Sequence, residues 1–340
     1  MIIRSRSPVR IEFGGGGTDL PKYFEEETGY VLNATINKYV YGTLKPKHTN
    51  DLRVLASDFK SSKLFSDIRR EGKFEGDIQL IKDIIAHLSV NYGVDIFLRS
   101  DIPPNTGLGS AATVAVSVIG LFNHLKYEKS MDRFDIAELA YKINNIGNEI
   151  PGGKQCQYAS TFGGLNMLEF RPDGNTRVHP LNIKRSTLLE LEKHLILAYV
   201  GKRESLEGVK QIITNQQLSY NDEQKTNKLH ELKELAIDMK QALVRNDLIT
   251  FGENLGKAWE IKKLLNPSIT NPKLDDIYNM ATKFGALGGR IIGAGGGGHM
   301  LFYCDSNKEQ QVSSRLQEAG IGIIDFSFTD KGLETWEANQ

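Results

Sequence analysis

The chain has 340 residues, of which 40% are hydrophobic and 25% charged, and its 42 Lys and Arg residues balance 42 Asp and Glu residues. At about 100–200 residues per domain, this length predicts two domains, each with its own core. A net charge of zero argues against broad nucleic-acid or anionic-membrane binding as the main role of the protein.

The sequence has few cysteines, and we expect it to contain neither a signal peptide nor a membrane span. Cys156 and Cys304 are the only cysteines, too few for a disulfide scaffold or a thiolate metal site. Residues 1–8 carry charges with no long apolar segment after them, so we expect no signal peptide. No run of 18 or more apolar residues occurs, so we expect no membrane span. The sequence therefore predicts a cytoplasmic protein without a membrane or nucleic-acid partner, and it carries no signal for the oligomeric state.

Strands and three helices are predicted in the first half of the chain. β-branched and aromatic residues favour strands, whereas apolar residues at helical spacing, such as Ile81, Ile84 and Leu88, favour helices. The strands are expected at residues 2–13, 29–46, 51–65, 94–100 and 163–170, and the helices at 78–91, 111–125 and 134–145.

A change in composition marks the middle of the chain. Pro and Gly residues within 171–186 predict a boundary between a domain of residues 1–185 and a domain of residues 186–340. The second domain is expected to be mostly helical over 206–284. Further strands are expected at 195–200, 290–292, 300–304 and 321–328, and a further helix at 312–318.

A strand, a glycine-rich turn and a buried helix follow one another at residues 94–125. The first amides of a helix lack intrahelical partners and the helix dipole adds about half a positive charge there, so this arrangement suits a phosphate. Gly107 and Gly109 let the backbone curve around a phosphate, and Ser110 offers a hydroxyl to the phosphate or to its metal. On spacing alone, a tight turn without a ligand is an equally good interpretation.

Two standard nucleotide patterns do not fit. No G-x-x-x-x-G-K-[ST] occurs, which excludes a P-loop of the Walker type. Residues 293–298 match G-x-G-x-x-G, but residues 299–304 after them favour a strand rather than a helix. The context of a dinucleotide-binding fold is therefore absent.

Three segments taken together resemble the GHMP kinase superfamily, namely residues 8–19, 104–110 and 293–298. The Gly-Gly-Gly-Thr-Asp form of the first segment resembles the D-glycero-D-manno-heptose 7-phosphate kinase branch, as do residues 152–155, 162–170 and 258–263. The resemblance implies an α+β, two-domain fold. Its N-terminal domain would be an ATP-binding, ribosomal S5 domain 2-like α/β sandwich, and its C-terminal domain a ferredoxin-like α+β domain with extra helices.

The resemblance also implies roles for single residues. Arg10 would lie near the transferred phosphoryl group, and Cys156 takes the position of the family's catalytic Asp. ATP would be bound by Pro104, Thr106, Gly107, Leu108, Gly109, Ser110, Gly295, Gly296 and Gly297, and Mg²⁺ in part by Ser110. The sugar or sugar-phosphate substrate would be bound by Gly16, Thr18, Asp19, Gly163 and Gly164, and a phosphate on it by Lys154, a role suggested by charge.

Each of these roles has a structural alternative. Arg10 could be a surface residue of a strand, and Asp19 could cap the segment that follows it. Residues 295–298 could be only a tight connection between strands, and Lys154 could be a solvated charge.

Three chemically central positions depart from the family pattern. Cys156 replaces the Asp that acts as catalytic base, Asn144 aligns with a magnesium-binding Glu, and Ala111 replaces a second Ser that ligates the metal. Glu149 lies close enough in sequence to supply the missing carboxylate. A positioned base contributes about 10²–10⁴-fold to a rate, and electrostatics and positioning dominate phosphoryl transfer, so loss of the Asp need not abolish activity. A Cys thiol, with an ordinary pKa of about 8.5, acts as a base only if that pKa is lowered.

Two main hypotheses follow. The first is an ATP-dependent kinase that transfers the γ-phosphate to a hydroxyl of a sugar or sugar phosphate, most like a heptose 7-phosphate. The second is a catalytically degenerate or repurposed member that binds nucleotide or sugar phosphate, as Ala111, Asn144 and Cys156 suggest. A minor third hypothesis makes Cys156 a nucleophile, but the candidate partners are scattered: His48, His87, His124, His179, His194, His230 and His299.

Overall fold

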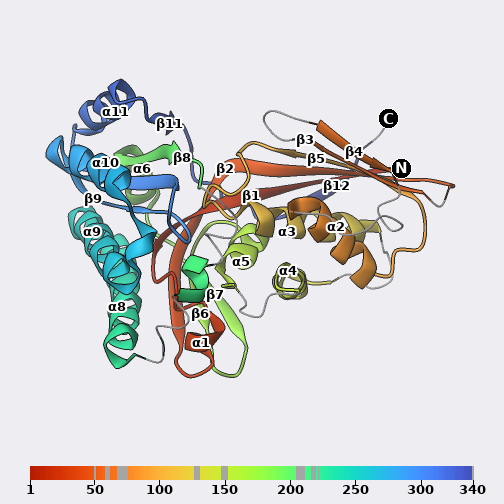
Figure 1. Ribbon diagram of the computed structural model, residues 1–340, viewed down its shortest axis with the longest axis horizontal. Coiled ribbons are helices and arrows are strands. Elements are labelled where there is room, and N and C mark those ends of the chain that lie inside the picture. The colour runs from red at the N-terminus through yellow and green to blue at the C-terminus, as the bar shows by residue number, and fades with distance from the viewer. Residues whose placement is uncertain are drawn as a thin grey trace.

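The computed structural model describes residues 1–49, 51–57, 62–66, 76–125, 131–146, 152–203, 211–215, 220 and 222–338. Two sheets, each with its own helices, lie side by side, the first on the right of Figure 1 and the second on the left. This mixed helix-and-sheet architecture is the one that the sequence predicts.

The first sheet has eight strands and is organised around its longest strand, β2. β2 pairs along one half with β5 and along the other half with β6, while β1 runs beside it. All described pairings are antiparallel except that of β3 with β5. The strands are β1 (Ile2–Gly14), β2 (Gly29–Pro46), β3 (Leu52–Ser57), β4 (Ser62–Ser66), β5 (Val94–Ser100), β6 (Leu165–Phe170), β7 (Thr176–Pro180) and β12 (Glu334–Ala338).

Helices cover one face of the first sheet (Figure 1). They are α2 (Gly76–His87), α3 (Ser110–Leu125), α4 (Arg133–Asn144) and α5 (Gln155–Phe162), and the short α1 (Pro21–Phe24) lies between β1 and β2. α3 is buried almost along its whole length. It approaches the sheet closely because Gly42 has no side chain, and a Cβ there would lie 2.5 Å from the hydroxyl of Ser5 and 2.8 Å from Leu121.

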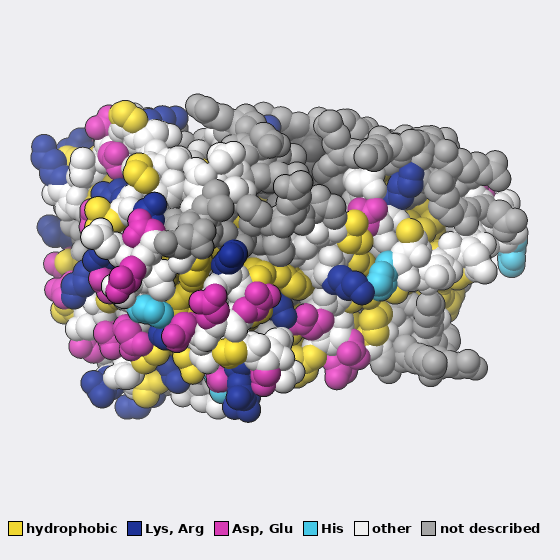
Figure 2. Space-filling view, turned by 60° about the horizontal axis from the view of Figure 1, so that its bottom comes forward, with side chains coloured by type: hydrophobic (Ala, Val, Ile, Leu, Met, Phe, Trp, Pro, Cys, Tyr) yellow, Lys and Arg dark blue, Asp and Glu magenta, His cyan; other side chains and the backbone are white. Residues whose placement is uncertain are grey.

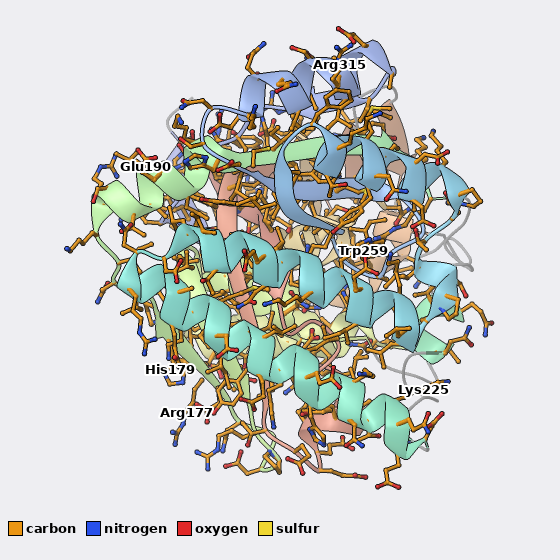
Figure 3. All side chains as sticks on the ribbon, turned by 90° about the vertical axis from the view of Figure 1, so that its left-hand side faces the viewer. Arg177, His179, Glu190, Lys225, Trp259 and Arg315 are labelled. Atoms are coloured by element: carbon orange, nitrogen blue, oxygen red, sulfur yellow. The ribbon has the colours of Figure 1, made fainter. Side chains whose placement is uncertain are left out.

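The second sheet has four antiparallel strands in the order β11-β8-β10-β9. The strands are β8 (Leu195–Gly201), β9 (Ala286–Ile291), β10 (Gly298–Cys304) and β11 (Gly322–Ile324). The helices in this half of the chain are α6 (Arg185–His194), α8 (Glu223–Arg245), α9 (Leu248–Leu265), α10 (Pro272–Lys283) and α11 (Glu309–Glu318), with a 3₁₀ turn, η2 (Pro267–Ile269). α8 packs on α9 and on β1 and β2 of the first sheet. Figure 3 shows α8 and α9 side by side, with the buried Trp259 on α9.

Most predicted helices and strands are present, but several short elements of the structure were not predicted. The sequence did not indicate α1, α5, α6 or β7. The predicted final strand shortens to β11, and the chain then runs on to β12, which pairs with β1 of the first sheet. Both chain ends therefore belong to the first sheet, while the boundary at residue 185 stays a prediction.

The distribution of charge on the surface and the apolar character of the helices can be compared with the sequence. Acidic and basic side chains are interspersed over the left half of the face shown in Figure 2, as expected from balanced charge. Within the described part of the chain, no helix combines the length and the apolar character needed to cross a bilayer.

Candidate active site

The glycine-rich turn after β5 has the shape of an anion cradle. Residues Asn105, Gly107 and Gly109 have φ angles of 62°, 90° and 84°, and α3 begins at Ser110 directly after them. Left-handed residues at alternate positions curve the backbone so that successive amides point into one concavity. The start of α3 adds its own unpaired amides to that concavity. The predicted strand, turn and helix are thus present, with the helix start at the turn.

The third glycine segment packs directly against this turn. A Cβ on Gly107 would lie 2.3 Å from the carbonyl oxygen of Ile292, and a Cβ on Gly298 would lie 2.3 Å from that of Thr106. Nδ1 of His299 donates to the same Thr106 oxygen at 2.8 Å. Burial lowers the pKa of His299 to about 4, so the ring is neutral at pH 7 and this bond does not depend on its charge. The two loops, from different sheets, hold each other in place.

Arg10 connects the turn to the start of α5. Its Nη1 donates to the carbonyl oxygen of Gly107 at 2.6 Å, and its Nη2 donates to Sγ of Cys156 at 3.1 Å. The residue is 3% exposed, which excludes the alternative of a surface strand residue. Its Nε is buried without a hydrogen-bond partner among the described residues.

Asp19 is buried against the start of α5. Its carboxylate accepts from the backbone N–H of Gly17 at 3.0 Å and of Gln155 at 3.2 Å. Gly153 makes room for it, since a Cβ there would lie 2.0 Å from Oδ2. The helix that follows Asp19 in sequence, α1, has Leu20 at its N-cap, so Asp19 does not cap it as the alternative proposed. Burial raises the pKa of Asp19, and the two backbone N–H groups oppose this only in part.

A cavity of about 130 Å³ opens between these groups. Its walls come from β1 and the turn after it, the start of α5, α9 and the loop after β9. It is lined by Arg10, Glu12, Gly16, Gly17, Asp19, Leu20, Gly153, Gln155, Cys156, Ile213, Lys262, Gly293 and Ala294.

A buried ion network forms the floor of the site. Oε1 of Glu12 lies 2.7 Å from Nη2 of Arg290, a close ion pair without the alignment of a hydrogen bond, and 3.8 Å from Nζ of Lys262. The same oxygen accepts from the backbone N–H of Gly16 at 3.0 Å. Burial opposes the charge of Glu12, but Arg290, Lys262 and Arg10 outweigh it and lower its pKa to about 2. Because Arg290 also donates to the carbonyl oxygen of Phe13, the network ties β9 and α9 to β1.

Comparison with known proteins agrees with this geometry. Residues 78–164 match the GHMP kinases N terminal domain and residues 239–322 match the GHMP kinases C terminal domain. The chain is 34% identical to the D-glycero-alpha-D-manno-heptose 7-phosphate kinase of Campylobacter jejuni, over 98% of both chains. The chain belongs to the GHMP kinase family. The predicted family and the predicted likeness to its heptose 7-phosphate kinase branch are confirmed.

Two solved structures of GHMP kinases extend the comparison. A D-glycero-D-manno-heptose 1-phosphate kinase of Bacteriodes thetaiotaomicron shares 27% identity and a TM-score of 0.81, covering 99% of this chain and all of that one. A putative sugar kinase of Campylobacter jejuni shares 34% identity and a TM-score of 0.76, with 98% of each chain covered. The two-domain GHMP kinase fold is therefore confirmed.

Two cations at this site were given no role from the sequence, although Lys262 lies within residues 258–263, one of the segments that resemble the heptose 7-phosphate kinase branch. Lys262 lines the cavity, is almost fully buried and donates to the carbonyl oxygen of Gly293 at 3.3 Å. Arg203 donates to the carbonyl oxygen of Ile292 at 3.2 Å beside Gly107, and burial and then the charge of Arg10 lower its pKa to about 10. Both belong to the second domain, so only the folded chain brings them to the site.

Lys154 and three other predicted substrate residues take structural places instead. The ammonium group of Lys154 lies 2.9 Å from Glu138 and is not among the cavity-lining groups, so its charge is neither solvated nor available in this structure. The hydroxyl of Thr18 lies within hydrogen-bond distance of two carbonyl oxygens, that of Gly15 in the turn after β1 and that of Tyr30 in β2. Gly163 and Gly164 hold the segment before β12, where a Cβ on Gly163 would lie 2.1 Å from the backbone nitrogen of Gly332. Their substrate-binding roles stay predictions.

Two of the three departures from the family pattern, Cys156 and Asn144, have distinct surroundings in the structure. Burial raises the pKa of Cys156 more than Arg10 lowers it, so its thiol stays protonated at neutral pH and is neither a base nor a strong nucleophile. Asn144 accepts a hydrogen bond from Gln157 at 3.2 Å. Glu149 lies outside the described residues. No group of three or more metal-ligating His, Cys, Asp or Glu side chains occurs among the residues described.

Substituting Gly107 tests the anion cradle. Gly107→Ala places a Cβ on a residue with a φ of 90° and against Ile292, so we expect the dissociation constant of ATP to rise at least about tenfold in isothermal titration calorimetry. Gly320→Ala is the matched control, because Gly320 has a φ of 77° with open space around its Cβ position. Equal ATP affinities for the two variants would contradict the cradle.

Substituting Glu12 tests the ion network. Glu12→Gln leaves Arg290 and Lys262 buried without a counter-charge, so we expect the free energy of unfolding at pH 7 to fall by about 3–5 kcal/mol in urea titrations. Because the folded pKa of about 2 lies below the ordinary 4.5, this stabilisation is complete above pH 4.5 and is lost as pH falls towards 2.

The control for Glu12 is the half-exposed pair of Arg6 with Glu334. Glu334→Gln should change the free energy of unfolding by about 0–1 kcal/mol, as expected for a solvated pair. A loss from Glu12→Gln no larger than this would show that the network does not hold the two domains together.

Proposed function

We propose that the protein transfers the γ-phosphate of ATP to a hydroxyl of a sugar phosphate, and that this substrate is a heptose 7-phosphate. The observation that carries the proposal is the position of Arg10, which donates hydrogen bonds both to the glycine-rich turn and to Cys156 at the wall of the cavity. A phosphoryl group bound at the turn would thus face an acceptor in the cavity, with a guanidinium beside it. The likeness to a heptose 7-phosphate kinase supports the choice of substrate.

The nucleotide side is assigned to the two glycine loops. The amides at residues 107–110 would bind the phosphates of ATP, and Gly295, Gly296 and Gly297 would shape the neighbouring loop. The buried Nε atoms of Arg10 and Arg203 lack hydrogen-bond partners among the described residues, and guanidinium groups suit phosphate oxygens. Both arginines would stabilise the charge that spreads over the transferred group.

Mg²⁺ fits this site with few protein ligands. It keeps several of its waters and takes one or two protein groups together with substrate phosphates. Ser110, the first residue of α3, would hold it with the phosphates of ATP. The ion would neutralise charge on those phosphates.

The acceptor side is assigned to Asp19 and Lys262. Asp19 would bind hydroxyl groups of the sugar, which are donors to a carboxylate. Lys262 would bind the phosphate that the acceptor already carries, the part that the sequence analysis gave to Lys154. Its Nζ has three donors, and the bond to Gly293 and the 3.8 Å ion pair with Glu12 leave capacity for an anion.

The cytoplasmic location of the protein also stays a prediction.

Turnover decides between the kinase and the degenerate member of the family. Purified protein is incubated with ATP, Mg²⁺ and a panel of sugars and sugar phosphates that includes D-glycero-α-D-manno-heptose 7-phosphate, and release of ADP is followed. We expect release with the heptose phosphate well above that with ATP alone. Tight ATP binding without acceptor-dependent ADP on any panel member would favour the non-catalytic alternative that Ala111, Asn144 and Cys156 suggest.

Lys262→Gln and Lys263→Gln form a matched pair for the acceptor phosphate. Lys262 is buried at the cavity, whereas Lys263 is partly exposed and pairs with Glu260 at 2.8 Å. We expect Lys262→Gln to raise the KM for heptose 7-phosphate at least about tenfold, with the KM for ATP unchanged, and Lys263→Gln to change neither beyond about twofold. Because burial lowers the pKa of Lys262 to about 8, wild-type affinity for the acceptor should weaken as pH rises above 8. An unchanged KM would remove Lys262 from the acceptor site.

A further inference from the structure

Four groups at the cavity could take the proton that the acceptor hydroxyl loses: the carboxylates of Glu12 and Asp19, the thiolate of Cys156 and the neutral amine of Lys262. With a pKa of about 8, Lys262 is mostly an ammonium ion at pH 7, and its proposed role is to bind the acceptor phosphate in that charged form. The family's catalytic Asp is absent, because its position is Cys156. This inference rests on the proposed kinase function and asks which group receives the proton.

Glu12 and Cys156 are unsuited to the task. Arg290, Lys262 and the amide of Gly16 converge on one oxygen of Glu12, which stabilises its ionised form and makes it a weak base. The thiol of Cys156 is already protonated at neutral pH and accepts a hydrogen bond from Arg10. Neither can gain a proton readily in the transition state.

Asp19 is in the opposite situation. It is 3% exposed, and the only hydrogen bonds that the described residues make to its carboxylate come from the backbone N–H groups of Gly17 and Gln155. No Lys, Arg or His of the described chain forms an ion pair with it. Each carboxylate oxygen has two acceptor sites, so both oxygens retain one for a substrate. Burial raises its pKa towards the operating pH, which favours general-base catalysis.

The carboxylate of Asp19 also lies in a suitable place for a general base. Oδ2 of Asp19 bonds to the amide of Gln155, the residue before Cys156 and the first of α5. The carboxylate therefore lies at the same helix start that carries the family's Asp position, and it reaches there from the turn after β1. We propose that Asp19 is the general base of this enzyme and takes over the proton-accepting role that Cys156 cannot fill.

The step is balanced with the groups already named. The acceptor O–H proton passes to Asp19, the acceptor oxygen forms a bond to the γ-phosphorus, and the bond between that phosphorus and the leaving oxygen of ADP breaks. The proton then leaves Asp19 to solvent as the product departs. Charged and titratable groups near Asp19 come from several elements: Arg10 and Glu12 of β1, Tyr141 of α4, Cys156 of α5, Tyr220, and Lys262 of α9.

A double-mutant cycle separates a base from a residue that only binds sugar. Wild type, Asp19→Asn, Cys156→Asp and the double variant are assayed with ATP, Mg²⁺ and heptose 7-phosphate, with ATP affinity and thermal melting measured for each. We expect Asp19→Asn to lower kcat by about 10²–10⁴-fold. Cys156→Asp should restore most of that loss in the double variant, while it raises the wild-type kcat far less.

The other outcomes contradict the proposal. A rise in KM with kcat unchanged in Asp19→Asn would leave Asp19 only a sugar ligand, and equal effects of Cys156→Asp in both backgrounds would mean that the two positions act independently. If Asp19→Asn does not fold, the wild-type pH profile decides: kcat should fall on the acid side with one ionisation, and a flat profile overturns the proposal. Absence of turnover by the wild type would instead overturn the proposed function itself.

Discussion

The buried charge of Glu12 is the constraint on which the site depends. It is held by Arg290 of β9 and Lys262 of α9, so a single carboxylate of the first sheet is neutralised from the second domain. A buried carboxylate is costly unless it is paired, and the fold therefore favours arrangements in which these two parts meet. Arg10 lies two residues before Glu12 on β1, on the same side of the strand, so the same contact fixes the arginine for which a catalytic role is proposed.

The two glycine loops show the consequence of that contact. Their backbones approach so closely that side chains at Gly107 or Gly298 would collide with the opposite loop. The concavity that is proposed to bind phosphate thus lies where the domains join, and the cavity opens beside it. In the proposed function, positive charge lies on the nucleotide side, and a carboxylate without a paired cation among the described residues lies on the acceptor side. If that carboxylate is the base, a GHMP kinase can function with Cys156 at the position of the family's Asp.

Local features of the fold were predictable and long-range ones were not. The strand, turn and helix at 94–125 follow from glycine placement and apolar spacing, and Arg10 and Asp19 follow from the pattern of the first segment. Lys262 belongs to a segment that resembles the heptose kinase branch, but its place at the cavity, like that of Arg203, could not be predicted because it depends on how the second domain packs on the first. Lys154 shows the reverse: its charge suggested a ligand, but folding places Glu138 beside it. The predicted role of Lys154 as a phosphate ligand is untested, but the ion pair with Glu138 shows that charge in the sequence does not reveal which partner the fold supplies.

A crystal structure with a non-hydrolysable ATP analogue and heptose 7-phosphate tests the central claim most directly. The account predicts the γ-phosphate between the amides at residues 107–110 and Arg10, with an acceptor hydroxyl between that phosphate and Asp19. The phosphate of the sugar should lie at Lys262. Nucleotide phosphates bound away from the glycine turn, or an acceptor hydroxyl out of reach of Asp19, would contradict it.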